Sequence, residues 1–296
     1  MKAYSDGYWQ SADGLRLHYR DYPGRAATGD AKGGQRPPVV CLPGLTRNAR
    51  DFENLAQRLA GHWRVLCPEM RGRSESDYAT DGSSYNPLQY VADVNALLDQ
   101  AGITRYVLVG TSLGGLMTML LAMAANSTAT DKIAGALLND IGPVLESSGL
   151  ARIGGYVGQG QSFADWAEAA DALAKTQAVA YPDYRADDWL AMARRLMRRG
   201  NDGRIAFDYD TKIAESFGQA SARPIDLWPG IDALARCPVL LVRGGLSDLL
   251  SADIFAQMRL RLPDAEAVTL PRIGHTPTLD EPEVTAAIDR WLAQVA

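Results

Sequence analysis

Three residue types that together perform nucleophilic catalysis occur in this chain in the order Ser112, Asp248 and His275. A serine hydroxyl attacks a carbonyl carbon efficiently only when a base takes its proton, and a carboxylate that orients the base completes the set. Ser112 lies among glycines in the stretch VGTSLGGL. This chemistry requires that the folded chain bring the three side chains together.

The serine lies where a strand pattern changes into a helix pattern. Residues 106–109 form a short apolar run typical of a buried strand, and residues 116–122 are unbranched helix formers. Three glycines surround the serine at this junction: Gly110, Gly114 and Gly115. Because glycine adopts unusual backbone angles and permits close packing, they predict a sharp, crowded turn that presents Ser112. A serine that only caps a helix gives a similar local pattern, so the rest of the chain must decide between the two interpretations.

His275 is the predicted base. It lies in the stretch LPRIGHTPTLDEP, between the last predicted strand and a final helix that Pro282 begins. Loops at the carboxyl ends of parallel strands form the ligand-binding edge of an open α/β sheet, and Ser112 also follows the carboxyl end of its strand. His18 alternates with apolar residues in a strand and His62 lies where a helix ends, so both have structural explanations.

Two aspartates follow strands between the serine and the histidine. Asp248 follows the penultimate predicted strand in the loop RGGLSD, and serine, acid, histidine is a common order of a catalytic triad. We therefore predict Asp248 as the acid. Asp140, in LLNDIGP, is the alternative acid, although we expect it to hold the exit of the chain from its strand by hydrogen bonds. Either aspartate caps a helix in the interpretation without catalysis.

Apolar strand-like runs alternate with helical stretches along most of the chain. The predicted strands are 8–11, 15–20, 39–42, 64–67, 106–109, 134–138, 239–242 and 267–270. The first two flank a hairpin signal, Asp13-Gly14, and predict an antiparallel pair. The pattern as a whole predicts an α/β fold with a mostly parallel eight-stranded sheet and helices on both faces. The glycine-rich stretch 24–38 predicts a surface loop.

Between Pro143 and Asp232 the sequence has helical stretches but no convincing strand. We predict that residues 144–232 form a helical cap, or lid, inserted after the sixth strand into a core of residues 1–143 and 233–296. Three cap residues are the predicted substrate-binding residues: Trp166, Trp189 and Met192. Trp228, Tyr156 and Phe163 belong to the same set of six, of which we expect two or three to face a ligand and the others to pack the cap against the core.

The composition excludes several classes of function. The chain has 296 residues, 47% of them hydrophobic, and its net charge of −5 disfavours nucleic acid or an anionic membrane as a partner. No segment resembles a signal peptide or a membrane span, so we expect a cytoplasmic protein. Three cysteines lie in or beside apolar runs and predict free thiols in a reducing compartment: Cys41, Cys67 and Cys237. With three histidines and no CxxC or HExxH motif, we expect no metal and no other cofactor.

Taken together, these motifs resemble the α/β-hydrolase superfamily over nearly the whole chain, and most of all its capped bacterial members, which include esterases, enol-lactonases and carbon–carbon bond hydrolases. The resemblance rests on the nucleophile elbow GTSLG, on the order of acid and histidine, and on CLPGLTRN and PEMRGRSESD after early strands. It implies an oxyanion hole formed by the backbone N–H groups of Leu45 and Leu113. Two departures stand out: Pro43-Gly44 replaces the usual His-Gly, which removes a side chain that braces the loop, and the later loop reads Arg71-Gly72-Arg73-Ser74, where a further glycine is frequent.

The resemblance implies a serine hydrolase that cleaves a small carboxylic ester or lactone through an acyl-enzyme on Ser112. The alternatives are a carbon–carbon bond hydrolase or an acyltransferase with the same triad, and a ligand-binding receptor that keeps the fold without turnover. Dehalogenases and epoxide hydrolases of this superfamily are disfavoured because they need a carboxylate in place of Ser112. The sequence defines neither the natural substrate nor the oligomeric state.

Overall fold

The computed structural model describes residues 2–24, 36–127, 131–220 and 225–295, so most of the predicted loop at 24–38 lies outside the described residues. Its centre is an eight-stranded sheet in the order β1-β2-β4-β3-β5-β6-β10-β11. The strands are β1 (Ser5–Gln10), β2 (Arg16–Tyr22), β3 (Val39–Leu42), β4 (Val65–Glu69), β5 (Tyr106–Thr111), β6 (Ile133–Asn139), β10 (Val239–Gly244) and β11 (Glu266–Leu270). β2 is antiparallel to β1 and β4, and the other neighbours are parallel. The predicted mostly parallel sheet is confirmed.

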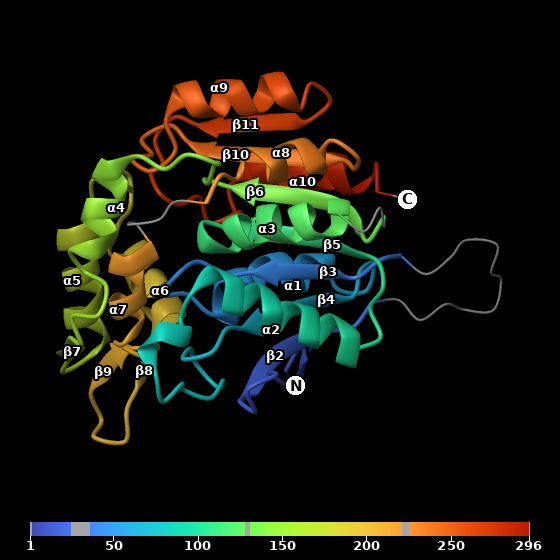
Figure 1. Ribbon diagram of the computed structural model, residues 1–296. Helices are drawn as coiled ribbons and strands as arrows, with labels where there is room; N and C mark the ends of the chain where they lie inside the picture. Colours follow the sequence, from blue (N-terminus) through green and yellow to red (C-terminus); the bar gives the residue numbers. More distant parts are fainter. Residues whose placement is uncertain (1, 25–35, 128–130, 221–224, 296) are drawn as a thin grey trace.

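Helices cover both faces of this sheet. Successive side chains of a strand point to opposite faces, and both faces are apolar here, so each needs a layer of helices to bury it. In β3, Val40 and Leu42 belong to one apolar cluster while Val39 and Cys41 belong to the other, and all four are fully buried. The helices packed in the first cluster are α2 (Pro87–Gln100), α3 (Leu113–Ser127), α8 (Trp228–Leu234) and α9 (Ala252–Arg261). Those in the second are α1 (Glu53–Leu59), which follows the 3-10 turn η1 (Ala49–Phe52), and α10 (Pro282–Leu292). Figure 1 shows the resulting layers.

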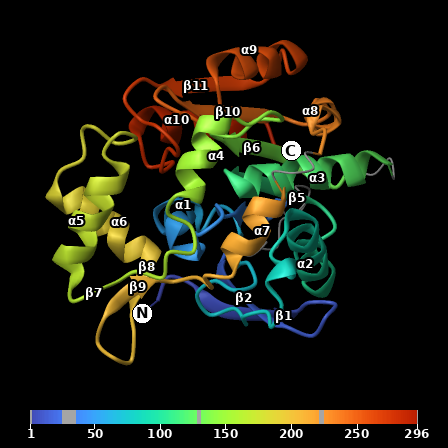
Figure 2. The same cartoon turned by 60° about the vertical axis from the view of Figure 1, so that its left-hand side comes forward.

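After β6 the chain leaves the sheet and forms a second group of elements, residues 144–220, which we call the cap. Its elements are α4 (Ser147–Gly154), β7 (Ser162–Phe163), α5 (Trp166–Gln177), α6 (Ala186–Leu196), β8 (Met197–Arg199), β9 (Ile205–Phe207) and α7 (Ile213–Ala220). They stand beside one end of the sheet in Figure 1, and Figure 2 turns them toward the viewer. α5 and α6 pack side by side.

Two features of this region differ from the prediction. β7, β9 and β8 form a small antiparallel sheet where the sequence predicted no strand, because segments of two or three residues are too short to show an alternating pattern. Residues 228–232 were predicted to end the cap, but they belong to α8, which packs against α3 over the main sheet. A Cβ at Gly230 would lie 2.7 Å from the Met119 carbonyl oxygen, so the glycine permits this close packing.

Polar contacts attach the cap to the core. Arg50 donates from Nε to the Arg195 carbonyl oxygen at 2.9 Å and from Nη2 to Asp208 Oδ2 at 2.7 Å. Tyr85, beside the 3-10 turn η2 (Gly82–Ser84), donates its hydroxyl to Asp210 Oδ2 at 2.6 Å. The core donors and cap acceptors therefore fix the cap over the loops that follow the strands.

Cys41, Cys67 and Cys237 all carry free thiols, and the first two are fully buried between the strands and the helices. Among the described residues, no helix has both the length and the apolar character that a membrane span requires.

Candidate active site

The turn between β5 and α3 holds Ser112 in a backbone conformation that most residues avoid. Its φ is 52°, in the left-handed region, where a residue with a side chain is strained. The flanking glycines are required by close packing. A Cβ at Gly110 would lie 2.5 Å from the Gly114 carbonyl oxygen, and one at Gly114 would lie 1.9 Å from the Leu42 carbonyl oxygen. The predicted crowded turn is therefore present, and a strained serine held this way at a strand end is typical of a presented nucleophile.

Ser112, His275 and Asp140 form one continuous hydrogen-bonded chain. Ser112 Oγ lies 2.8 Å from His275 Nε2, and His275 Nδ1 lies 2.8 Å from Asp140 Oδ2. Because the carboxylate accepts a hydrogen bond from Nδ1–H, the neutral imidazole has an unprotonated Nε2 that accepts a hydrogen bond from the serine hydroxyl. The histidine side chain is 7% exposed and the aspartate is fully buried, whereas Ser112 is half-buried and faces the cavity described below.

Backbone and side-chain donors from the loop after β10 hold Asp140 in place. Gly244 donates its N–H to Oδ1 at 2.8 Å, and Ser247 donates its hydroxyl to Oδ2 at 2.7 Å. With the His275 bond, the buried carboxylate has three donors, which compensate for its removal from water. This arrangement suits a carboxylate that orients the imidazole.

The prediction that Asp248 lies against the histidine is wrong. Its carboxylate instead pairs with Arg152 of α4, which donates from Nε at 2.5 Å and from Nη2 at 2.8 Å. These hydrogen bonds hold the pKa of Asp248 below its ordinary value although partial burial acts to raise it. The loop after β10 does reach the site, but it does so through Gly244 and Ser247. Asp248 lies beyond this contact and joins the cap to the core.

The loop after β3 is shaped so that the Leu45 N–H is available as a donor. Arg47 donates its N–H to the Gly44 carbonyl oxygen at 3.1 Å, which fixes the Gly44–Leu45 peptide, and the N–H of a trans peptide points opposite to its carbonyl. Leu113 begins α3, so its N–H has no partner within the helix. Two amides next to Ser112 are thus suited to stabilise a negatively charged oxygen.

Arg73 braces this loop, which sequence reasoning missed. Its side chain is fully buried and donates to the Leu45 carbonyl oxygen from Nε at 3.0 Å and from Nη2 at 2.6 Å. Nη1 donates to the Arg71 carbonyl oxygen and to Tyr90 Oη. The sequence showed only that a frequent glycine is missing from the stretch Arg71-Gly72-Arg73-Ser74. The structure shows that the Arg73 side chain holds the loop after β3, in which Pro43 replaces the usual histidine.

A cavity of about 170 Å³ lies between Ser112 and the cap. Its walls combine the catalytic edge of the sheet with apolar cap side chains, among them Ile153, Val157, Phe163, Leu173, Met192, Leu196 and Phe207. Polar cap side chains also border it, among them Tyr156, Gln159, Gln177 and Tyr181. Within the described ranges no cluster of three His, Cys, Asp or Glu side chains is placed to hold a metal ion.

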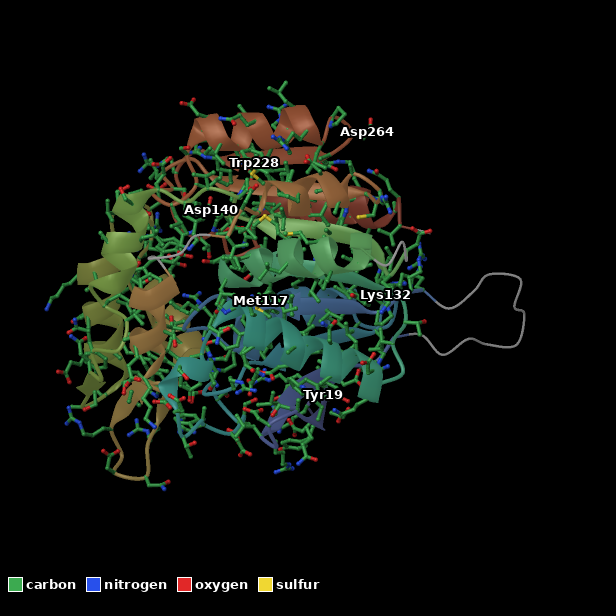
Figure 3. The ribbon with its side chains drawn as sticks, in the orientation of Figure 1. Tyr19, Met117, Lys132, Asp140, Trp228 and Asp264 are labelled. Atoms are coloured by element: carbon green, nitrogen blue, oxygen red, sulfur yellow. The ribbon has the colours of Figure 1, made fainter. Side chains whose placement is uncertain are left out.

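Of the three predicted substrate-binding residues, Met192 lines this cavity and the two tryptophans do not. Trp189 is 7% exposed and packs edge-on against Tyr181 and Tyr184 within the apolar cluster of the cap. Trp166 packs at the border of the same apolar cluster. Trp228 lies on α8 over the main sheet (Figure 3). Its ring is in contact with the Arg261 guanidinium.

Among the wider set of six candidates, three line the cavity: Tyr156, Phe163 and Met192. This number agrees with the expectation that two or three would face a ligand.

Tyr181 connects the cap to the histidine loop and was also missed by sequence reasoning. Its hydroxyl donates to the Thr276 carbonyl oxygen at 2.8 Å and accepts the Thr276 N–H at 2.9 Å. Next to it, the Gly274 N–H donates to the Ala180 carbonyl oxygen at 2.6 Å. The residues on both sides of His275 are therefore held by the cap.

Known proteins resemble this chain over most of its length. A model of the alpha/beta hydrolase family matches residues 39–288. The crystal structure of an alpha/beta hydrolase from Novosphingobium aromaticivorans is 57% identical, with 100% of both chains covered and a TM-score of 0.92. A 3-hydroxybutyrate-oligomer hydrolase from Cupriavidus necator is 34% identical over 252 residues, which are 82% of this chain and 84% of that protein. A 2-(acetamidomethylene)succinate hydrolase from Mesorhizobium japonicum is 28% identical and covers 88% of this chain and 90% of its own.

Proposed function

Because the chain belongs to the alpha/beta hydrolase family, we propose that it is a serine hydrolase that cleaves a carboxylic ester through an acyl-enzyme on Ser112. The observation that carries the proposal is the hydrogen-bonded chain from Ser112 through His275 to Asp140. The catalytic residues proposed here keep the serine and the histidine of the sequence prediction and take Asp140 in place of Asp248.

In the first half of the reaction, His275 Nε2 takes the Ser112 proton while Oγ attacks the ester carbonyl carbon. The tetrahedral oxygen receives hydrogen bonds from the Leu45 and Leu113 N–H groups, and Asp140 stabilises the imidazolium. Collapse of this intermediate breaks the ester bond, and His275 returns the proton to the leaving alkoxide.

In the second half, His275 takes a proton from water, and the resulting hydroxide attacks the acyl-enzyme carbonyl carbon. The same two amides stabilise the second tetrahedral oxygen. Its collapse releases the carboxylic acid, and His275 returns the proton to Ser112 Oγ. The cycle uses only groups of this chain and water.

We take a short ester of a hydroxyacid as the substrate class. The relative from Cupriavidus necator, named for its action on 3-hydroxybutyrate oligomers, supports this class at 34% identity. The cavity of about 170 Å³ also suits units of a few carbon atoms. Its mixture of apolar cap side chains and amide or phenol groups matches a substrate that alternates methyl and ester groups.

The test combines covalent labelling with turnover. A fluorophosphonate should label the wild-type protein at Ser112, and Ser112→Ala should abolish labelling and lower the rate on a 3-hydroxybutyrate dimer by at least about 10⁴-fold. Ser251 is the matched control, because its hydroxyl only caps α9 by accepting the Ile254 N–H. Ser251→Ala should cost about 1 kcal/mol of stability and leave the labelling unchanged.

Three outcomes would contradict the proposal. Near-normal ester hydrolysis by the Ser112→Ala variant would end the serine-hydrolase assignment. Labelling without turnover of any ester or lactone would favour a receptor. Cleavage of β-diketones in preference to esters would favour a carbon–carbon bond hydrolase.

A further inference from the structure

Arg47 brings a positive charge to the candidate active site. It is the only arginine or lysine among the described residues that line the cavity, and no aspartate or glutamate is among them. A Cβ at Gly44 would lie 3.0 Å from Arg47 Cγ and 3.7 Å from Ser112 Cβ. The arginine side chain therefore begins directly beside the nucleophile, in the space that Gly44 leaves open.

Asp51 holds the guanidinium group through one nitrogen only. Arg47 Nε donates to Asp51 Oδ2 at 2.5 Å, and neither Nη1 nor Nη2 has a hydrogen-bond partner among the residues that the structure describes. The arginine side chain is 22% exposed, and the residue borders the cavity. Because the two Nη groups carry four of the five guanidinium N–H donors, the group can bind a carboxylate with two parallel hydrogen bonds.

Asp51 is the acidic partner of Arg47, and the two tyrosines beside the arginine add no second negative charge. Burial raises the pKa of Tyr156 and Tyr181, and the charge of Arg47 acts to lower both. The pKa of Tyr181 is about 12, so the phenol is neutral near pH 7. Another arginine, Arg152 of the cap, is paired through two nitrogens with Asp248 and does not line the cavity. Arg47 is thus the charged group best placed to select a substrate.

We propose that Arg47 binds a free carboxylate of the substrate, so that the enzyme prefers esters that carry an unmodified carboxyl group over neutral esters of the same shape. This inference rests on the proposed esterase function. In an ester of a 3-hydroxyacid, the carboxylate is separated from the ester oxygen by only two carbon atoms. An arginine beside Ser112 can reach a group at that separation while the ester carbonyl lies at the nucleophile.

The experiment compares two substrates that differ only in charge, 3-butanoyloxybutanoate and its carboxamide. Wild-type kcat/KM should be at least about 10-fold higher for the carboxylate, as expected for hydrogen bonds between charged groups. Arg47→Met should lower kcat/KM for the carboxylate by about 10- to 100-fold and for the carboxamide by less than about 3-fold. The double variant Arg47→Met/Asp51→Asn should give the same pattern without an unpaired buried aspartate.

Two further arginines provide matched controls. Arg64→Met removes an arginine paired through two nitrogens with Asp21, outside the cavity lining, and should keep the preference for the carboxylate. Arg152→Met should also keep it. Equal losses on both substrates in the Arg47 variants, no preference in the wild-type protein, or loss of the preference in the Arg152 variant would each overturn the inference.

Binding to the Ser112→Ala protein separates this inference from the proposed function. By calorimetry, the carboxylate should bind at least about 10-fold more tightly than the carboxamide, and Arg47→Met in the same background should remove the difference. If the wild-type protein hydrolyses neither compound, the esterase proposal fails, and this binding measurement still decides the role of Arg47. Equal binding of the two compounds would overturn that role.

Discussion

The core side and the cap side of the candidate active site are built by different means. On the core side, Ser112 and Asp140 directly follow the paired strands β5 and β6, so backbone pairing sets their separation, and His275 lies in the loop after β11 of the same sheet. On the cap side, Phe163 and Met192 reach the cavity from separate short elements, whose positions depend on side-chain packing. This difference predicts that substitutions of Ser112, Asp140 or His275 should remove the chemistry, whereas substitutions in the cap should change which substrate is used.

The largest expected effect distinguishes the two aspartates. Asp140→Asn should lower kcat by about 10⁴-fold near neutral pH, because an amide at this position favours the wrong imidazole tautomer. Asp248→Asn should lower kcat by less than about 10-fold, since Asp248 binds Arg152 rather than His275. Steady-state kinetics on folded variants measure both values. A larger loss of kcat in the Asp248 variant would show that Asp248, and not Asp140, is the acid of the triad.

The next effect tests the brace of the oxyanion loop. Arg73→Met should lower kcat by about 10- to 100-fold with little change in KM, because loss of a donor to the developing oxyanion costs up to about 10³-fold and here the donor is only displaced. Arg71→Met is the control. Arg71 is equally buried, but it pairs with Asp93 and Asp13 and does not touch Leu45.

The Arg71 variant should therefore lower the melting temperature while the folded protein keeps its kcat. Thermal unfolding followed by circular dichroism, together with kinetics well below the transition, separates the two effects. An equal loss of kcat in both variants would show that Arg73 acts through general stability alone.

A smaller effect tests the part of the cap that holds the base. Tyr181→Phe removes both hydrogen bonds to Thr276 and should lower kcat about 5- to 10-fold, in line with about 1 kcal/mol for a hydrogen bond. Tyr184→Phe, in the same aromatic cluster, should leave kcat unchanged. If both variants behave alike, the histidine loop is held without the help of the cap hydroxyl.

The smallest effect on rate should come from the cavity wall. Met192→Ala should change the preference between acetyl and hexanoyl esters by a few-fold, as removal of methylene contacts changes relative transition-state binding. Trp189→Ala should instead destabilise the protein by about 3–5 kcal/mol and leave the preference unchanged, because this side chain is buried away from the cavity. Chain-length profiles and denaturant unfolding provide the two readouts. A changed chain-length profile in the Trp189→Ala variant would show that Trp189 does line the cavity.

The core side was largely predictable from the sequence, except for the choice of acid. Apolar runs identify the strands, and glycines mark the turn at Ser112. Both aspartates follow strand ends, so local pattern does not choose between them. The choice depends on strand order and register: β6 lies beside β5 and Asn139 pairs with Thr111, which brings the next residues, Asp140 and Ser112, close together.

The cap side was less predictable for a physical reason. An apolar helix face looks the same whether it meets a cavity or another helix, so the sequence did not distinguish Met192 from Trp189 on α6. Strands of two or three residues give no period to detect. The positions of Arg73 and Tyr181 depend on contacts between distant segments, which no local pattern records.

The contacts around His275 make the cap a poor candidate for modular exchange. A Cβ at Gly274 would lie 2.8 Å from Ala180 Cα, and Tyr181 holds the opposite side of the histidine through Thr276. A chimera that receives the cap of a distant relative gains new substrate contacts. It also loses the hydrogen bonds that hold the residues on both sides of His275, unless the new cap has a tyrosine and a turn that replace Tyr181 and Ala180. Changes of specificity made through the cap of this scaffold are therefore confined to positions outside 180–181, and a chimera should regain its rate when these two residues are restored.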